Sequence, residues 1–161
     1  MKQLLLIAMT VLMLGLGTTW AGPVDDSGAP HEGVDYASEL KIFRPLAAQG
    51  NATAQFNLGV MHDVGRGVMQ DYAQAAKWYR LAATQGHAAA QFNLGGMYFD
   101  GQGVTQNFVR AYMWFALAAG AGYEGAAKNR NSIAREMTLE QIAQAQQLAR
   151  DCQRRNFKGC E

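Results

Sequence analysis

Cysteine is scarce in this chain of 161 residues, and its two cysteines, Cys152 and Cys160, both lie within the last ten positions. Two thiols are too few for a structural zinc site, which takes four ligands. An even number of cysteines in a chain that leaves the cytoplasm favours a disulfide. We therefore predict a Cys152–Cys160 bond that fastens the carboxyl-terminal tail.

A large net charge of either sign is also missing, since the full chain carries a formal charge of +1. Without Lys2, which lies in a segment that we expect to be removed, 13 basic side chains balance 13 acidic ones. Proteins that bind nucleic acid carry a basic surface, and capture by an anionic membrane needs a similar excess. The sequence therefore predicts no nucleic-acid partner and no membrane partner after signal cleavage.

Side chains that carry catalysis are few and scattered. The histidines and serines fall in different parts of the chain: His31, His62, His87, Ser27, Ser38 and Ser132. The turn Gly65-Arg66-Gly67 lacks the third glycine of a dinucleotide loop, and no Lys-Ser or Lys-Thr pair follows it. These residues suggest no triad, metal centre or cofactor site. We expect a protein that is not an enzyme, with no catalytic residue, cofactor or metal.

The amino terminus has the pattern of a secretory signal. A basic start at Lys2 precedes the apolar run Leu4–Leu16. Thr19 and Ala21 then place small residues at the two positions that a signal peptidase recognises before its cleavage site. A run of this length rises only about 20 Å as a helix, against a hydrocarbon core of about 30 Å. We predict cleavage after Ala21 and a mature protein that is periplasmic or secreted; a membrane anchor is the alternative.

The dominant feature of the chain is an internal repeat of 36 residues. Residues 52–87 and 88–123 are identical at 18 of 36 aligned positions. The longest shared run, Ala-Gln-Phe-Asn-Leu-Gly, occupies 54–59 and 90–95. The register extends beyond both units, because Tyr36, Tyr72 and Phe108 are each one period apart. A repeat of this length indicates stacked helical units, none of which buries its apolar face alone.

Each unit is predicted to form two helices. In the first, about 52 to 63, Ala54, Leu58 and Met61 share one stripe. Glycines 65 and 67 accept the positive φ of a tight reversal. For the second helices we predict N-caps at Asp71 and Asn107 and terminating glycines at 86 and 122.

Small residues on the first helices predict close packing. Gly59 and Gly95 are expected to let backbones approach and to leave room for Trp78 and Trp114 between units.

The last segment is predicted to be an end cap. Thr138–Gln141 has the form of a capping box, and it is followed by an apolar stripe. That stripe consists of Leu139, Ile142, Ala145, Ala149 and Cys152.

These motifs resemble the Sel-one-like repeat (SLR), a relative of the tetratricopeptide repeat. The resemblance rests on residues 90–98, on Gly101-x-Gly103-Val104-x-Gln106 and on Ala75-x-x-Trp78-Tyr79-Arg80, and it covers about 35 to 152. It implies an all-α fold, a right-handed α/α superhelical solenoid of helix-turn-helix repeats, in which first helices line a concave face. It also implies an adaptor or scaffold role, although fold alone does not name a partner.

We expect the chain to divide into four parts. Residues 1–21 are the signal peptide, 22–33 a disordered leader, 34–155 the solenoid and 156–161 the tail with the disulfide. Within the solenoid we expect a half-repeat at 34–50, full repeats at 52–87 and 88–123, and a partial repeat with a capping helix at 124–155. The third unit departs from the repeat, having Lys128-Asn129-Arg130-Asn131 in place of Phe-Asn-Leu-Gly.

The first helices offer a candidate partner surface. Positions four and three apart share a helix face, and one such face is offset from the core stripe. With nearby variable aromatics, the predicted partner-binding residues are Thr53, Asn57, Val60, Val64, Asn93, Asp100, Tyr98 and Phe99. Phe99 is the best anchor if it is exposed, whereas the alternative is that it packs under the turn. Asn57 and Asn93 are also candidates for hydrogen bonds to the turns.

The sequence therefore predicts an exported adaptor or scaffold, a monomer that binds an unidentified protein or peptide through its concave face. A secreted effector directed at a host or neighbouring cell is a second possibility. The enzyme alternative is a secreted β-lactamase-like or penicillin-binding protein of the cysteine-rich repeat type. Those proteins resemble this chain in repeat length but carry a cysteine pair in each repeat, which is lacking here. Hydrolysis of a chromogenic β-lactam distinguishes the two classes.

Overall fold

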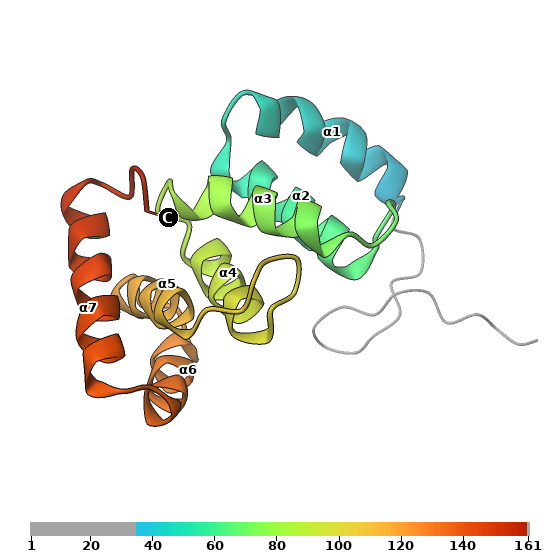
Figure 1. Ribbon diagram of the computed structural model, residues 1–161. Coiled ribbons are helices and arrows are strands. Elements are labelled where there is room, and N and C mark those ends of the chain that lie inside the picture. The colour runs from blue at the N-terminus through green and yellow to red at the C-terminus, as the bar shows by residue number, and fades with distance from the viewer. Residues whose placement is uncertain (1–34, 161) are drawn as a thin grey trace, which may run out of the picture. The chain divides into compact units, whose positions relative to one another are not determined.

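A computed structural model describes residues 35–160 (Figure 1), so the predicted signal peptide (1–21) and disordered leader (22–33) lie outside the described residues. The described part is all-α, as predicted. It contains α1 (Tyr36–Ala48), α2 (Ala52–Val64), α3 (Tyr72–Ala83), α4 (Ala88–Asp100), α5 (Phe108–Gly120), α6 (Ala126–Ile133), a short 3-10 helix (Ala134–Glu136) and α7 (Leu139–Arg154). None of these helices has the length and apolarity that a membrane crossing requires.

The helices begin at the predicted caps. The Asp71 carboxylate accepts the Gln74 backbone N–H at 3.0 Å, and the Asn107 side chain accepts that of Arg110 at 3.0 Å. Thr138 and Gln141 form the full capping box, each side chain bonding the other's backbone N–H. These bonds satisfy N–H groups that a helix start otherwise leaves without an acceptor.

The helices end at the predicted glycines. Gly86 has a φ of +84° and donates its N–H to Ala83, while His87 donates to Ala82. This pair of bonds is the Schellman arrangement, which needs a left-handed residue that glycine adopts without steric cost. Gly122 ends α5 in the same way, with a φ of +79°.

Helix pairs stack along the chain. In each full unit the first helix packs on the second, α2 on α3 and α4 on α5, and α3 also packs on α4 of the next unit. Figure 1 shows α7 beside α5, and α7 packs on α5. The described helices are therefore packed as helix-turn-helix repeats followed by a terminal helix.

Two glycines on the first helices make room for rings, but not for the tryptophans. A Cβ at Gly59 would lie 2.5 Å from Cδ1 of Tyr79, and one at Gly95 would lie 2.9 Å from Cδ1 of Phe115. The side chain that crosses each glycine is thus the residue after the tryptophan, which corrects the sequence-based assignment. The reason is geometric, because adjacent helical residues point about 100° apart.

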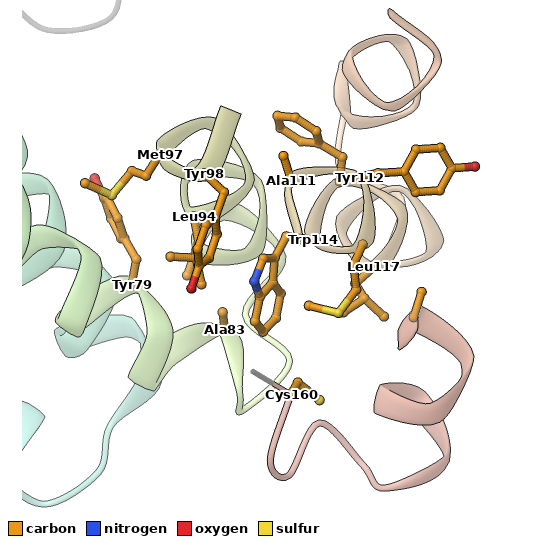
Figure 2. Packing of buried hydrophobic residues seen from close by; sticks show 14 of the residues in the cluster. Tyr79, Ala83, Leu94, Met97, Tyr98, Ala111, Tyr112, Trp114, Leu117 and Cys160 are labelled. Atoms are coloured by element: carbon orange, nitrogen blue, oxygen red, sulfur yellow. The ribbon is translucent and has the colours of Figure 1, made fainter. Parts of the chain in front are cut away.

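The terminal helix and tail close the end of the stack. Cys152 and Cys160 form the predicted disulfide, and both belong to the main buried cluster. Figure 2 shows Trp114 of α5 pointing toward Ala83 and Cys160. Of the predicted α7 stripe, Ala145, Ala149 and Cys152 are buried, but Leu139 is 86% exposed. Leu139 is the first residue of α7, ahead of the turn that reaches the core, so the packed stripe starts later than predicted.

Candidate partner-binding surface

The first helices present most of the predicted partner-binding residues at the surface. We use the term first-helix face for Thr53, Asn57, Val60 and Val64 on α2 with Asn93 and Asp100 on α4. Thr53, Val64 and Asp100 are exposed, and the other three are half-buried. Accessible side chains with both polar and apolar groups are suited to contact with another protein.

Tyr98 does not belong to this face. Its side chain is only 6% exposed and packs in the main core cluster. Its hydroxyl accepts hydrogen bonds from Arg80 at 3.1 Å and from Arg110 at 3.4 Å. The reason lies in the helical spacing: Gly96 is the equivalent of Val60 on the first-helix face, and Tyr98 points about 200° away from it. A ring buried in this way is a packing residue rather than an exposed anchor.

Phe99 is half-buried and lies at the edge of a small pocket. Its ring stacks on that of Phe108 with 5.7 Å between centroids, which is the packing under the turn that the sequence left open. It also helps to line a cavity of about 140 Å³, which we call the apolar pocket. The residues that line it are Phe99, Phe115, Asn129, Ser132 and Ile133.

The equivalent place one unit earlier is filled with polar groups. Phe99 corresponds to Asp63 and Phe115 to Tyr79 in the 36-residue register. The Tyr79 hydroxyl donates to the Asp63 carboxylate at 3.0 Å and also bonds Asn93. Burial raises the pKa of Asp63, and burial together with the Asp63 charge raises the pKa of Tyr79. The second unit exchanges this polar cluster for an apolar cavity.

The sequence interpretation missed Asn129 and Ser132. Asn57, Asn93 and Asn129 are one period apart, and Ser132 corresponds to Gly96. Both missed residues lie on α6, so they continue the first-helix face into the third unit. The register itself was the available signal, but the loss of the Phe-Asn-Leu-Gly phrase around Asn129 concealed it.

His87 connects two units and is sensitive to protonation. Its Nδ1 accepts the Ala90 backbone N–H at 3.3 Å as the N-cap of α4, and its ring stacks on Phe56 at 4.7 Å. Burial lowers the pKa of His87 below its usual value. A proton on Nδ1 removes the acceptor, so the neutral ring is the form that the folded chain prefers.

We expect His87→Asn to weaken the pH dependence of stability. A depressed pKa means that the stabilisation is present above the unfolded-state pKa of about 6.5 and is lost as the pH falls below it. Asn51 caps α2 at the equivalent position, so asparagine keeps the cap. Between pH 7 and pH 5 the fall in unfolding free energy should shrink by roughly half, because His62 also has a lowered pKa and remains. Urea unfolding at both pH values measures this, and parallel curves for variant and wild type would refute it.

Metal chemistry has no visible support in residues 35–160. No group of three His, Cys, Asp or Glu side chains in this part of the chain is close enough to hold a metal ion.

Comparison with known proteins agrees with this architecture. The Sel1 repeat family matches residues 52–87 and 88–123. A solved structure of a protective antigen present in uropathogenic Escherichia coli strains, which displays an SLR fold, is 39% identical with a TM-score of 0.70. The match covers 72% of this chain and 25% of that one. No curated protein matches the chain in sequence.

A second solved structure, that of a Sel1 repeat protein from Oxalobacter formigenes, is 36% identical with a TM-score of 0.59. The match covers 63% of this chain and 42% of that one, so the chain spans less than half the length of either structure. The resemblance predicted from the sequence is confirmed. With its two matched units and its helix-turn-helix architecture, the chain belongs to the Sel1 repeat proteins, whose helical repeats are similar to tetratricopeptide repeats.

Proposed function

We propose that this protein is an exported adaptor of the cell envelope that binds a segment of another protein along its first-helix face. The observation that carries the proposal is the apolar pocket beside that face. Phe115 and Ile133 form its buried floor, while Asn129 and Ser132 add polar groups. Apolar cavities with a few polar groups at the edge are typical of sites that hold a side chain of a partner.

The size of the pocket indicates what it holds. Its volume is about 140 Å³, and a cavity of about 150 Å³ lined by Leu, Ile and Phe side chains is large enough for benzene. One large aliphatic or aromatic side chain of a peptide therefore fits. Asparagines recur along α2, α4 and α6, and an asparagine side chain carries both a donor and an acceptor, although that of Asn93 also bonds Tyr79. Such amides suit the backbone of an extended segment.

The proposal of export rests on the amino-terminal sequence and on the disulfide. The basic start, the apolar run Leu4–Leu16 and the small residues before Gly22 are the parts of a cleavable signal. Disulfides such as Cys152–Cys160 persist in oxidising compartments. Both features support a mature protein that works outside the cytoplasm.

A photo-crosslinking amino acid in place of Thr53 or Asp100 tests the surface in intact cells. Both positions are exposed on the first-helix face, so each variant should give a discrete adduct with a partner. Ser132→Leu should lower the adduct yield about tenfold, because the longer side chain fills the pocket that receives the anchor. Ser132→Ala leaves the pocket open and should retain the adduct. Mass spectrometry of the adduct should find a chain that starts at Gly22.

The control is the same crosslinker in place of Gln144, which is exposed on α7. An equal adduct from Gln144, or a yield that Ser132→Leu leaves unchanged, would argue against the first-helix face. An adduct whose chain starts at Met1 would argue against export.

A further inference from the structure

The polar cluster of the first unit occupies the same place in its unit as the apolar pocket occupies in the second. We call this cluster of Asp63, Tyr79 and Asn93 the polar subsite. In the 36-residue register these three residues correspond to Phe99, Phe115 and Asn129 of the apolar pocket. Each set takes one residue from the end of a first helix, one from the following second helix and one from the next first helix. The repeat therefore carries two equivalent subsites, one polar and one apolar.

Asp63 carries its charge at an unfavourable position. It is the next-to-last residue of α2, where the partial negative charge of a helix C-terminus opposes a carboxylate. The residue is half-buried, and burial raises its pKa. Within residues 35–160 the carboxylate accepts from the Tyr79 hydroxyl and forms no ion pair. Residues 1–34 contain a single basic side chain, Lys2 of the predicted signal peptide, so we expect a cation for Asp63 to come from another molecule.

The fold does not require a carboxylate at this position. The equivalent residue is Phe99 in the second unit, and both first helices end in the same way, at a left-handed glycine. Tyr79 holds the carboxylate in place, because its side chain is fully buried and its hydroxyl bonds both Asp63 and Asn93. A positioned charge that the fold does not need is the kind of local exception that marks binding sites.

We propose that the polar subsite binds the ammonium group of a lysine in the same partner segment whose apolar side chain enters the apolar pocket. This inference rests on the function proposed above. Oδ2 of Asp63 accepts from Tyr79, whereas Oδ1 has no hydrogen-bond partner within residues 35–160. An ammonium group needs only one such oxygen, while a guanidinium binds best to both oxygens of a carboxylate at once. The partner segment is thus recognised by one basic and one apolar side chain, held one repeat apart.

The test is a titration of the protein with synthetic peptides, followed by two-dimensional NMR of the backbone amides. Each peptide contains one Lys and one Leu separated by two to six glycines, in either order, and each has a control with norleucine, which lacks the ammonium, in place of Lys. The best-binding peptide should shift the amides of Val64 and Asn93 together with those of Asn129 and Ser132. Its norleucine control should bind about tenfold more weakly, because the charge-assisted bond to Asp63 is lost.

Asp63→Asn removes the charge and keeps a side-chain oxygen for the Tyr79 hydroxyl. It should weaken binding of the Lys peptide about tenfold, to the level of the norleucine control. Its thermal midpoint should stay the same or rise, because a half-buried charge without a cation is lost. Glu140→Gln removes an equal charge from the exposed start of α7 and should leave binding unchanged. Ser132→Leu fills only the apolar pocket, so it should weaken the Lys and norleucine peptides by the same factor.

The outcomes separate this inference from the proposed function. Equal binding of the Lys and norleucine peptides, with shifts at Asn129 and Ser132, would overturn the lysine subsite and leave the apolar pocket as a binding site. Unchanged Lys-peptide binding by Asp63→Asn would have the same meaning. A lower thermal midpoint of this variant would show that the carboxylate serves the fold, and would also overturn the inference. No shift at either subsite with any peptide of the set would count against both the inference and the proposed function.

Discussion

Replacing Gly103 by alanine is expected to lower the free energy of unfolding by about 3 kcal/mol, which corresponds to about 10 °C in Tm. Gly103 has a φ of +67°, where an L side chain is strained. A Cβ at this position would also lie 2.1 Å from the Tyr72 carbonyl oxygen and 2.7 Å from the Ala73 nitrogen. These are backbone atoms of α3, so the contact cannot be relieved by turning a side chain.

Gly122→Ala separates the two contributions. Gly122 has a φ of +79°, but a Cβ there would meet no atom within 4 Å. This variant should lose only the conformational part, about 1 kcal/mol. Urea unfolding followed by circular dichroism at 222 nm measures both losses. If the two variants lose the same amount, the close approach of the turn to α3 is not a determinant of stability.

The Gly103 contact illustrates where interpretation of the sequence stopped. The repeat showed that positions 67 and 103 are both glycine, and turn geometry predicted their positive φ. The sequence did not reveal that each turn also packs on the helix start of the previous unit, Gly67 on Tyr36 and Gly103 on Tyr72. A contact between units depends on how the units stack. The 36-residue repeat shows which positions are identical, but it does not show how closely the turn of one unit approaches the helix of the previous unit.

The helix boundaries were more accessible to prediction than the packing. Caps at Asp71, Asn107 and Thr138 are local hydrogen bonds, so their residues are recognisable within four positions. The role of Gly59 was assigned to the wrong ring, because Trp78 and Tyr79 are adjacent and only the stacking decides which one crosses the glycine. Local chemistry was therefore predictable, and side-chain choice between units was not.

The candidate site was likewise predictable in part: single exposed positions on a helix could be predicted, whereas a pocket formed by several helices could not. The exposed positions Thr53, Val64 and Asp100 followed from helical spacing alone. The apolar pocket did not, since Phe99, Phe115 and Ile133 come from three helices and meet only after the units stack. Comparison of equivalent positions, rather than of helix faces, is what reveals the exchange of Asp63 and Tyr79 for two phenylalanines.

Trp114→Ala is expected to cost about 4 kcal/mol, the largest loss among the variants considered for stability. Its side chain is 1% exposed within the main core cluster, and its removal leaves a cavity that the surrounding helices fill only in part. Since small proteins are stable by about 5–15 kcal/mol, such a loss leaves the folded state marginal. Chemical unfolding of the purified oxidised protein gives the value.

Trp78→Ala is the matched control, because the two tryptophans are one period apart. Trp78 is only half-buried and packs against the smaller cluster around Leu58 and Met61. Its replacement should cost less than half as much as that of Trp114. The difference has a structural cause, since Trp114 points toward Cys160 of the tail that the disulfide holds in place (Figure 2). Equal losses at the two positions would mean that the tail contributes nothing to the burial of Trp114, and the role of the disulfide would have to be sought in α7 alone.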